Sequence, residues 1–509
     1  MSSGTPPRPP KARSVIPAVR RTGLLCALTA TAALLPAAPV HATPPAPALR
    51  FGACPDSVPA PPAPARVECG RLSVPLDRSH PDGKHLRIAV SRVRATGPAS
   101  ERRGVLLVNP GGPGGPGLSY AVTKRAKLPE RVRRAYDVIG FDPRGTGASA
   151  PADCGPMGGL FDSPGPDPVP ESRTAEQAYL HTLRRTADDC ARGVKDALPH
   201  LSTTETARDM DALRAALGEP RIGFLGVSYG SYLGAAYAAR FPQRVGRMVL
   251  DSVVGPRDWF DFDLMQSRAL VRQRAVFFAW TARHEQRFGL GTEAAAVRAA
   301  YQRVRDQLST HPVNGFGAAE FDRTVYRALG RTERWPGLAD GLRTYLRDGK
   351  TGPLRPEEPF DGAASRPYEA ANRTVKCADG PAPTPVRVTA GIRQMLRLDP
   401  QPVLTGMEAS VCAYWHHRPA HRTQLGSPDA PPVLLIASTH DPVTPVRGAR
   451  EMQRRLPGSR LVSLHNDYSH GVFASRGNSC VDGTAAAYLV DGTVPPADVH
   501  CSGPGLPTP

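Results

Sequence analysis

Short apolar runs recur along the chain, separated by stretches with helical spacing. Six runs predict buried strands: Gly104 to Val108, Tyr136 to Phe141, Arg221 to Val227, Val245 to Leu250, Pro432 to Ala437 and Arg460 to Leu464. Between them, residues 174–192, 204–217 and 231–240 have the periodicity of amphipathic helices. Because strands that alternate with helices form parallel sheets covered on both faces, the sequence predicts an α/β fold.

Two parts of the chain depart from this alternation. Residues 67–95 read as two alternating strands joined by a turn at His80 to Gly83, which predicts an antiparallel edge to the sheet. After residue 256, apolar strands are missing for a long stretch. Helices are expected there over residues 257–288, 292–308, 318–329 and 335–346, followed by a looser segment from 353 to 430. We interpret residues 257–430 as a helical lid inserted between two parts of the core, 65–256 and 431–509.

The N-terminal segment has the pattern of an export signal. Basic residues end at Arg20 and Arg21, an apolar stretch covers residues 22–38, and small residues follow at 40–42. We therefore expect a signal peptide over residues 1–42, a flexible lead-in rich in proline and alanine over residues 43–64, and a secreted protein. No later segment suggests a membrane span, so no integral membrane association is expected once the signal is removed.

The cysteine count fits an oxidising compartment. Loss of Cys26 with the signal would leave eight cysteines, an even number that suggests four disulfides. Pairing of sequence neighbours is the simplest of the possible schemes: 54 with 69, 154 with 190, 377 with 412, and 480 with 501. Neither a CxxC pair nor an HExxH motif occurs, so we expect no metal site and no cofactor.

The net charge of +18 does not by itself indicate a nucleic-acid-binding protein. The basic residues are scattered, and neither a finger spacing nor an aromatic-basic module accompanies them. We expect no nucleic-acid partner and a monomer. At 509 residues the chain is longer than one ordinary core requires, which agrees with a catalytic core carrying an insertion.

The most informative motif joins a predicted strand to a predicted helix. Gly226 to Gly230 reads GVSYG and lies where the strand at Arg221 to Val227 ends and the helix begins. This is the pattern of a nucleophile elbow, in which a tight turn exposes a serine hydroxyl at the end of a strand. We predict Ser228 as a nucleophile; the alternative is a solvated serine in a glycine-rich turn.

A serine nucleophile needs a base to take its proton and a carboxylate to orient that base. In this architecture the acid and the histidine follow the serine in the chain, on loops after later strands. Asp441 and His470 satisfy that order and are predicted to complete a triad with Ser228. Asp251 is the competing acid. His440 and His465 are the competing bases.

A glycine-rich loop follows the strand at Gly104 to Val108. Asn109 to Gly117 reads NPGGPGGPG, and such a loop exposes backbone amides that can stabilise a negatively charged oxygen. We predict an oxyanion hole formed by the Tyr229 amide and an amide of the Gly111-Gly112 turn.

Taken in order, the motifs resemble those of secreted bacterial α/β-hydrolase peptidases of the prolyl and tripeptidyl aminopeptidase family. They are VPLD, NPGGPGGPG, DPRGTGAS, GVSYGSYLGAAYAARFP, HDPVTP and a final HG. The resemblance implies an α/β-hydrolase fold with a C-terminal segment like that of tripeptidyl aminopeptidases. It also implies serine exopeptidase action on peptides with a free N-terminus, with Gly112 and Tyr229 at the oxyanion positions. Ser469 departs from the pattern, since glycine is expected before His470.

Exopeptidase action requires a carboxylate to bind the substrate's α-ammonium. The sequence does not choose among the acidic residues of the insertion: Asp261, Asp263, Glu357, Glu358, Glu369, Asp379 and Glu408. Two other functions remain open. A triad also serves a carboxylesterase acting on small acyl esters, and the same fold could be a secreted binding protein without activity.

Overall fold

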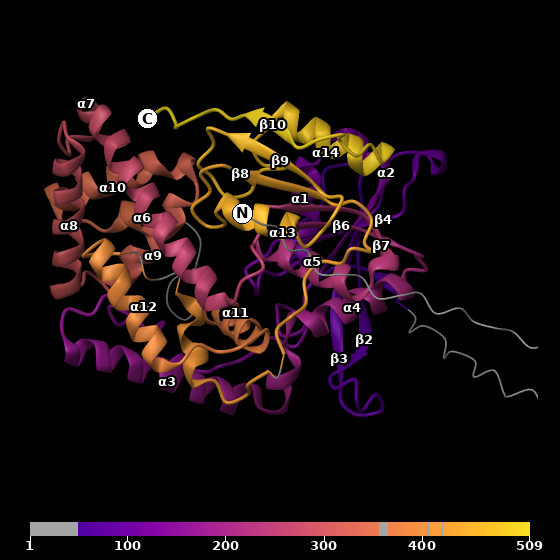
Figure 1. Cartoon of the computed structure of the whole chain (residues 1–509), viewed down its shortest axis with the longest axis horizontal. Coiled ribbons are helices and arrows are strands. Elements are labelled where there is room, and N and C mark those ends of the chain that lie inside the picture. Colours follow the sequence, from indigo (N-terminus) through magenta and orange to yellow (C-terminus); the bar gives the residue numbers. More distant parts are fainter. Residues whose placement is uncertain (1–48, 356–364, 403, 405–406, 420) are drawn as a thin grey trace, which may run out of the picture. The chain divides into compact units, whose positions relative to one another are not determined.

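The computed structural model describes residues 49–509 except 356–364, 403, 405–406 and 420 (Figure 1). The strands are β1 Phe51–Gly52, β2 Val67–Pro75, β3 His85–Val93, β4 Val105–Asn109, β5 Asp137–Phe141, β6 Ile222–Val227, β7 Val245–Asp251, β8 Leu434–Ser438, β9 Arg460–His465 and β10 Val499–Ser502. They form one ten-stranded sheet in the order β1-β2-β3-β5-β4-β6-β7-β8-β9-β10.

The sheet is antiparallel at one edge and parallel elsewhere. The β2–β3 hairpin pairs Val67 with Val93 and Pro75 with His85, and β3 joins β5 in antiparallel register. From β5 to β10 all neighbours are parallel. The predicted mostly parallel α/β fold is therefore confirmed. Strand β10 was not predicted, because four residues of mixed polarity carry no clear pattern.

Helices pack on both faces of the sheet because strand side chains alternate between the faces. On one face, Leu106 and Val108 of β4 belong to a core shared with α1 Leu118–Lys127, α2 Glu130–Ala135 and α14 Ser479–Asp491. On the other face, Val105 and Leu107 belong to a core shared with α3 Arg173–Val194, α4 Thr203–Ala216, α5 Tyr229–Arg240 and α13 Val446–Gln453.

The chain between β7 and β8 is mainly helical and is called the insertion below. Its helices are α6 Trp259–Arg283, α7 Glu285–Phe288, α8 Ala294–Thr310, α9 Ala318–Leu329, α10 Trp335–Asp348, α11 Arg366–Ala378 and α12 Pro385–Leu398. Helices α6, α8, α9 and α10 lie together beside the sheet (Figure 1). They have a core of their own, in which Phe277 and Trp280 contact Trp335.

Helices α11 and α12 correct the prediction of a looser segment from 353 to 430. Their prolines, Pro367 and Pro385, fall in the first helical turn, where a missing amide hydrogen costs little. In α12, Val388, Ile392 and Met395 recur at helical spacing and are buried. The abundance of proline there marks helix starts as well as loops.

Four disulfides join the cysteines that neighbour each other in sequence: Cys54–Cys69, Cys154–Cys190, Cys377–Cys412 and Cys480–Cys501. The simplest predicted pairing is confirmed. The first disulfide and the pairing of β1 with β2 attach residues 51–54 of the predicted lead-in to the sheet.

The predicted signal peptide, residues 1–42, lies outside the described residues. Among the helices that the structure describes, none combines the length and the apolar composition needed to cross a bilayer.

Candidate active site

Ser228 occupies a strained turn between β6 and α5. Its backbone has φ 59° and ψ −125°, a conformation that L-residues rarely adopt. Its amide donates to the carbonyl oxygen of Asp251 at 2.9 Å, which holds the turn against β7. A Cβ atom at Gly226 would lie 2.2 Å from the Gly230 carbonyl oxygen, and one at Gly230 would lie 2.8 Å from the Asn109 carbonyl oxygen. Glycine on both sides of Ser228 is therefore a steric requirement of the turn.

Asp441 and His470 are brought together from two loops that follow neighbouring strands. The Nδ1 atom of His470 lies 2.8 Å from Asp441 Oδ2. Asp441 is fully buried, and its other oxygen accepts the amides of Val443 and Thr444 at 2.8 and 3.0 Å. The hydroxyl of Thr444 also donates to Asp441 Oδ2 at 2.7 Å. These bonds fix the carboxylate, which in turn orients the imidazole ring.

Ser228 and His470 line one cavity of about 340 Å³. Gly112 and Tyr229, the predicted oxyanion residues, line it as well. Its remaining lining comes largely from the insertion and from the segment between β5 and α3. The volume lies in the usual range for small-molecule sites.

The glycine-rich loop lies directly against the elbow. A Cβ atom at Gly111 would lie 2.5 Å from the Val227 carbonyl oxygen and 2.9 Å from Ser228 Cβ. The side chain of Asn109 accepts the Gly111 amide at 3.0 Å and shapes the turn. Among the described residues, no acceptor is bonded to the amides of Gly112 or Tyr229. Both amides therefore remain available to an oxygen atom bound beside Ser228.

Asp251, the competing acid, forms hydrogen bonds to the loop that carries the histidine. It is buried, and its carboxylate accepts the amides of Val472 and Phe473, two and three residues after His470. Burial raises the pKa of Asp251 and lowers the pKa of the nearby Lys124 to about 8. Lys124 donates to the Phe473 carbonyl oxygen, so both buried charges hold the same loop.

The competing bases lie away from this cavity. The His440 ring stacks on Tyr468 at a centroid distance of 4.4 Å, and His465 contacts His500 at the sheet edge. Neither is among the residues that line the cavity.

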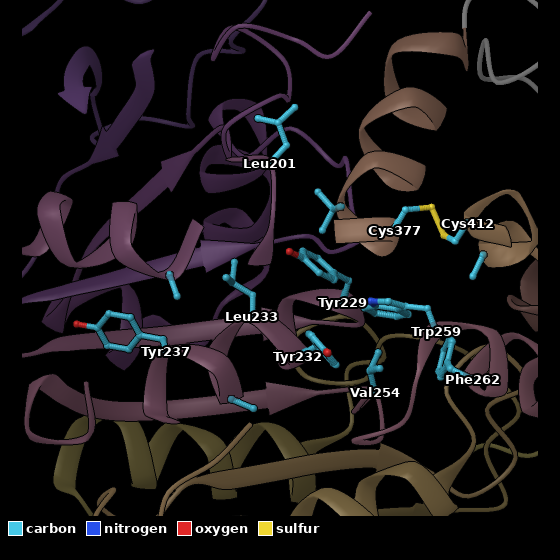
Figure 2. Close-up of a cluster of buried hydrophobic side chains, with 14 of the residues drawn as sticks. Leu201, Tyr229, Tyr232, Leu233, Tyr237, Val254, Trp259, Phe262, Cys377 and Cys412 are labelled. Carbon is cyan, nitrogen blue, oxygen red and sulfur yellow. A yellow bond between two sulfur atoms is a disulfide. The ribbon is translucent and has the colours of Figure 1, made fainter. Parts of the chain in front are cut away.

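Aromatic side chains join the elbow helix to the insertion (Figure 2). The ring centroid of Trp259, at the start of α6, lies 4.8 Å from that of Tyr232 and 6.1 Å from that of Tyr229. Phe262 meets Trp259 edge to face, and the Cys377–Cys412 disulfide lies nearby. The first turn of the insertion is thus anchored directly to the helix that begins after Ser228.

Two of the seven candidate carboxylates line the cavity. Glu408 accepts from Lys376 Nζ at 2.5 Å, and Glu369 pairs with Arg373. Asp263 lies behind them, fully buried, 3.1 Å from the same Lys376 Nζ. Burial raises the pKa of Asp263 to about 7, with the charge of Glu408 adding to the shift. Three carboxylates therefore share two cations.

The other candidates lie elsewhere. Asp261 pairs with Arg387 near the surface, and Asp379 is buried, where it accepts from Thr203 and Trp259. Burial raises the pKa of Asp379 to about 6. Neither residue lines the cavity. Glu357 and Glu358 lie outside the described residues.

Sequence reasoning missed Thr444, which touches both Asp441 and His470, and the cavity arginines Arg331 and Arg334. Thr444 lies in the HDPVTP motif, and a hydroxyl three residues after the acid could have indicated a hydrogen bond to Asp441. The arginines had none, since they resemble the many surface arginines of the chain. Within the described residues, no three His, Cys, Asp or Glu side chains are grouped as a metal site would require.

The fold and the Ser228 elbow define a class of enzyme. The family model described as alpha/beta hydrolase fold matches residues 104–474, and the chain belongs to this family. Its relatives include the tripeptidyl aminopeptidase of Streptomyces lividans, 35% identical over 88% of this chain and 86% of the relative. Serine protease Hip1 of Mycobacterium bovis is 30% identical over 88% and 90% of the two chains. Carboxylesterase B of Mycobacterium tuberculosis is 31% identical over 86% of each. The predicted resemblance is confirmed, and the chain is a serine hydrolase.

Proposed function

We propose that the protein is a secreted, monomeric serine exopeptidase that releases short peptides, with tripeptides preferred, from free N-termini. The observation that carries the proposal is the cavity that Ser228 and His470 line together with Glu369 and Glu408 of the insertion. The similarity to a tripeptidyl aminopeptidase supports the choice of tripeptides over single prolyl residues. The four disulfides support an extracellular location.

In the proposed reaction Ser228 Oγ attacks the scissile carbonyl carbon while His470 Nε2 accepts its proton. Asp441 holds the Nδ1 proton of His470 and stabilises the imidazolium that forms. The amides of Gly112 and Tyr229 bind the oxyanion of the tetrahedral intermediate. His470 then protonates the leaving amine, and a water molecule hydrolyses the acyl-enzyme through the same steps.

The carboxylates of the insertion supply the proposed site for the substrate's α-ammonium. Above about pH 7, where Asp263 is ionised, Asp263, Glu369 and Glu408 carry three negative charges against the two positive charges of Arg373 and Lys376. An added ammonium would balance this cluster. Glu408 and Glu369 are the members that line the cavity, so we assign the binding to them.

The residues between β7 and β8 then act as a lid that sets how much peptide fits between the ammonium site and Ser228. In this proposal the domain organisation is that of the sequence prediction: a signal at 1–42, a lead-in at 43–64, a core at 65–256 and 431–509, and a lid at 257–430.

The test compares free and N-acetylated p-nitroanilides of single amino acids, proline and tripeptides. The proposal predicts cleavage of the free tripeptidyl substrate and loss of most of that activity on acetylation, because acetylation removes the charge that the carboxylates bind. Cleavage of simple esters with no cleavage of any free nitroanilide would contradict it.

The second candidate function is that of a carboxylesterase. A relative named Carboxylesterase B and the ability of a triad to cleave esters favour it. An esterase would be indifferent to acetylation, so the same comparison separates the two functions. A binding protein without activity would leave Ser228 unlabelled by a serine-reactive phosphonate.

A further inference from the structure

The cavity is lined by basic residues besides those of the acidic cluster, and the proposed function does not use them. Arg331 and Arg334 line the cavity beside Gly330. Neither guanidinium forms a hydrogen bond or ion pair with any residue in the described part of the chain. Glu333, the acidic residue between them, is paired with Arg476 at 3.0 Å. The charge of Arg331 helps to lower the pKa of Glu333, but the guanidinium donors of both arginines remain available to a ligand.

The segment from Gly330 to Arg334 is fastened to the loop of His470. The amide of His470 donates to the Gly330 carbonyl oxygen at 2.9 Å. The hydroxyl of Ser469 accepts the Thr332 amide at 3.2 Å and lies 3.0 Å from the Thr332 hydroxyl. Ser469 is the residue at which glycine was expected, and its hydroxyl makes contacts that glycine would lack.

A buried side chain of α6 is bonded to the residues that immediately precede both segments. The Nε2 group of Gln273 donates to the carbonyl oxygens of Leu329 and Tyr468 at 3.3 and 2.8 Å. Several hydrogen bonds thus fix the backbone that carries the two arginines relative to the loop of His470. A fixed backbone lowers the cost of ordering the two side chains on a ligand.

Because the arginine segment is bonded to the loop of His470, the role of this histidine indicates which part of a substrate meets the arginines. The histidine of a triad protonates the leaving amine, so the residues after the scissile bond lie on its side of the cavity. Guanidinium groups suit carboxylates, to which they donate paired hydrogen bonds. Resting on the proposed function, we infer that Arg331 and Arg334 form a subsite for a carboxylate on the leaving-group side of the substrate.

Two parts of a peptide could supply this carboxylate: the C-terminus of a short peptide or an acidic side chain after the scissile bond. The first would favour peptides only a few residues longer than the released fragment. The second would select sequence in longer substrates. In both, the α-ammonium would bind the acidic cluster and the carboxylate would bind the arginines.

The test uses three alanine pentapeptides, each with a free N-terminus, that differ in their C-terminal residue or group. One ends in a carboxylate, one ends in an amide, and one ends in an amide but carries aspartate at the fifth position. Product masses give kcat/KM for each peptide with the wild type, with the double variant Arg331→Gln and Arg334→Gln, and with the matching double lysine variant. Arg347→Gln is the control, because Arg347 is exposed on α10 and does not line the cavity.

The wild type should cleave the free acid about tenfold or more better than the plain amide, the size expected for hydrogen bonds to a charged group. The glutamine variant should bring this ratio close to one, while the lysine and Arg347→Gln variants keep most of it. If aspartate restores efficient cleavage of the amidated peptide, an acidic side chain is a second source of the carboxylate. If it does not, the C-terminus is the only source.

Equal cleavage of all three peptides by the wild type, or an unchanged ratio in the glutamine variant, would overturn the subsite. The wild type is also assayed on a free tripeptidyl p-nitroanilide, whose leaving group carries no carboxylate. Failure there would refute the proposed function itself, whereas cleavage there with equal rates on the pentapeptides would refute only the subsite.

Discussion

The carboxylate of Asp251 accepts the backbone amide of Val472 at 3.0 and 3.1 Å, and Val472 is two residues beyond His470. The same carboxylate accepts the amide of Phe473 at 3.0 Å. The carbonyl oxygen of Asp251 accepts the amide of Ser228 at 2.9 Å. One residue at the end of β7 therefore positions both the elbow and the histidine loop.

Replacing Asp251 with asparagine should impair catalysis more than substrate binding. The amide side chain keeps one acceptor but turns a donor toward backbone amides, so the loop should shift and His470 should lose its alignment with Ser228. We expect kcat on a free tripeptidyl nitroanilide to fall by about tenfold to a hundredfold with KM nearly unchanged. Steady-state kinetics on the folded variant measure both parameters. A rise in KM as large as the fall in kcat would contradict this expectation and would show that Asp251 acts mainly on the insertion.

Replacing Asp441 with asparagine should have a larger effect, because the imidazole then loses the carboxylate that selects its tautomer. The expected fall in kcat is about a thousandfold to ten-thousandfold. Asp467→Asn is the matched control: Asp467 is buried in the neighbouring loop and accepts the Ser469 amide, which asparagine can also accept. If the two variants lost activity equally, Asp441 would have no special part in the reaction.

The buried Asp263 should make stability depend on pH. Its pKa is about 7 in the folded protein, against an ordinary value of 3.8, so only the folded state holds the proton between these values. Stability should fall as the pH rises through this window, by about 1.4 kcal/mol per pH unit from this group, and level off above 7. In Asp263→Asn this contribution is absent. Denaturant unfolding of both proteins at pH 5, 6, 7 and 8 should show that the unfolding free energy of the wild type falls relative to that of the variant up to pH 7. A difference that does not change with pH would contradict the assignment.

The Cys377–Cys412 disulfide joins α11 to the 3-10 helix Glu408–Tyr414, the two elements that carry Glu369 and Glu408. Replacing both cysteines with serine should lower the unfolding free energy by about 2 to 4 kcal/mol and raise KM for free N-terminal substrates. The matched control replaces Cys480 and Cys501, which join α14 to β10 outside the insertion. That variant should lose stability without a rise in KM. A rise in both variants would mean that KM reports general loosening.

The sequence predicted those parts of the molecule whose signals are local. The apolar runs gave the central strands, because strands β4, β5 and β8 are buried along their whole length. The GVSYG turn could be read because its residues are adjacent in the chain and Gly226 is required by a contact with Gly230, although Gly230 itself is required by the distant Asn109. Asp441 and His470 could be paired in advance, because parallel strands deliver their following loops to the same edge of a sheet.

The charges of the insertion could not be placed in this way. Glu408 faces the cavity because Lys376, Asp263 and the Cys377–Cys412 disulfide hold two distant segments together, and these contacts span more than thirty residues of chain. Surface acids such as Asp261 have the same local pattern. The position of Glu408 therefore depends on tertiary packing that periodicity and composition do not encode.

The most direct test of the central claim is the cleavage pattern of one hexapeptide with a free N-terminus and of its N-acetylated form. Product masses are followed with the wild type and with Ser228→Ala. We predict release of an N-terminal fragment, chiefly the tripeptide, from the free peptide only, and no product with the variant. Cleavage of the acetylated peptide at a comparable rate, or undiminished cleavage by Ser228→Ala, would contradict it.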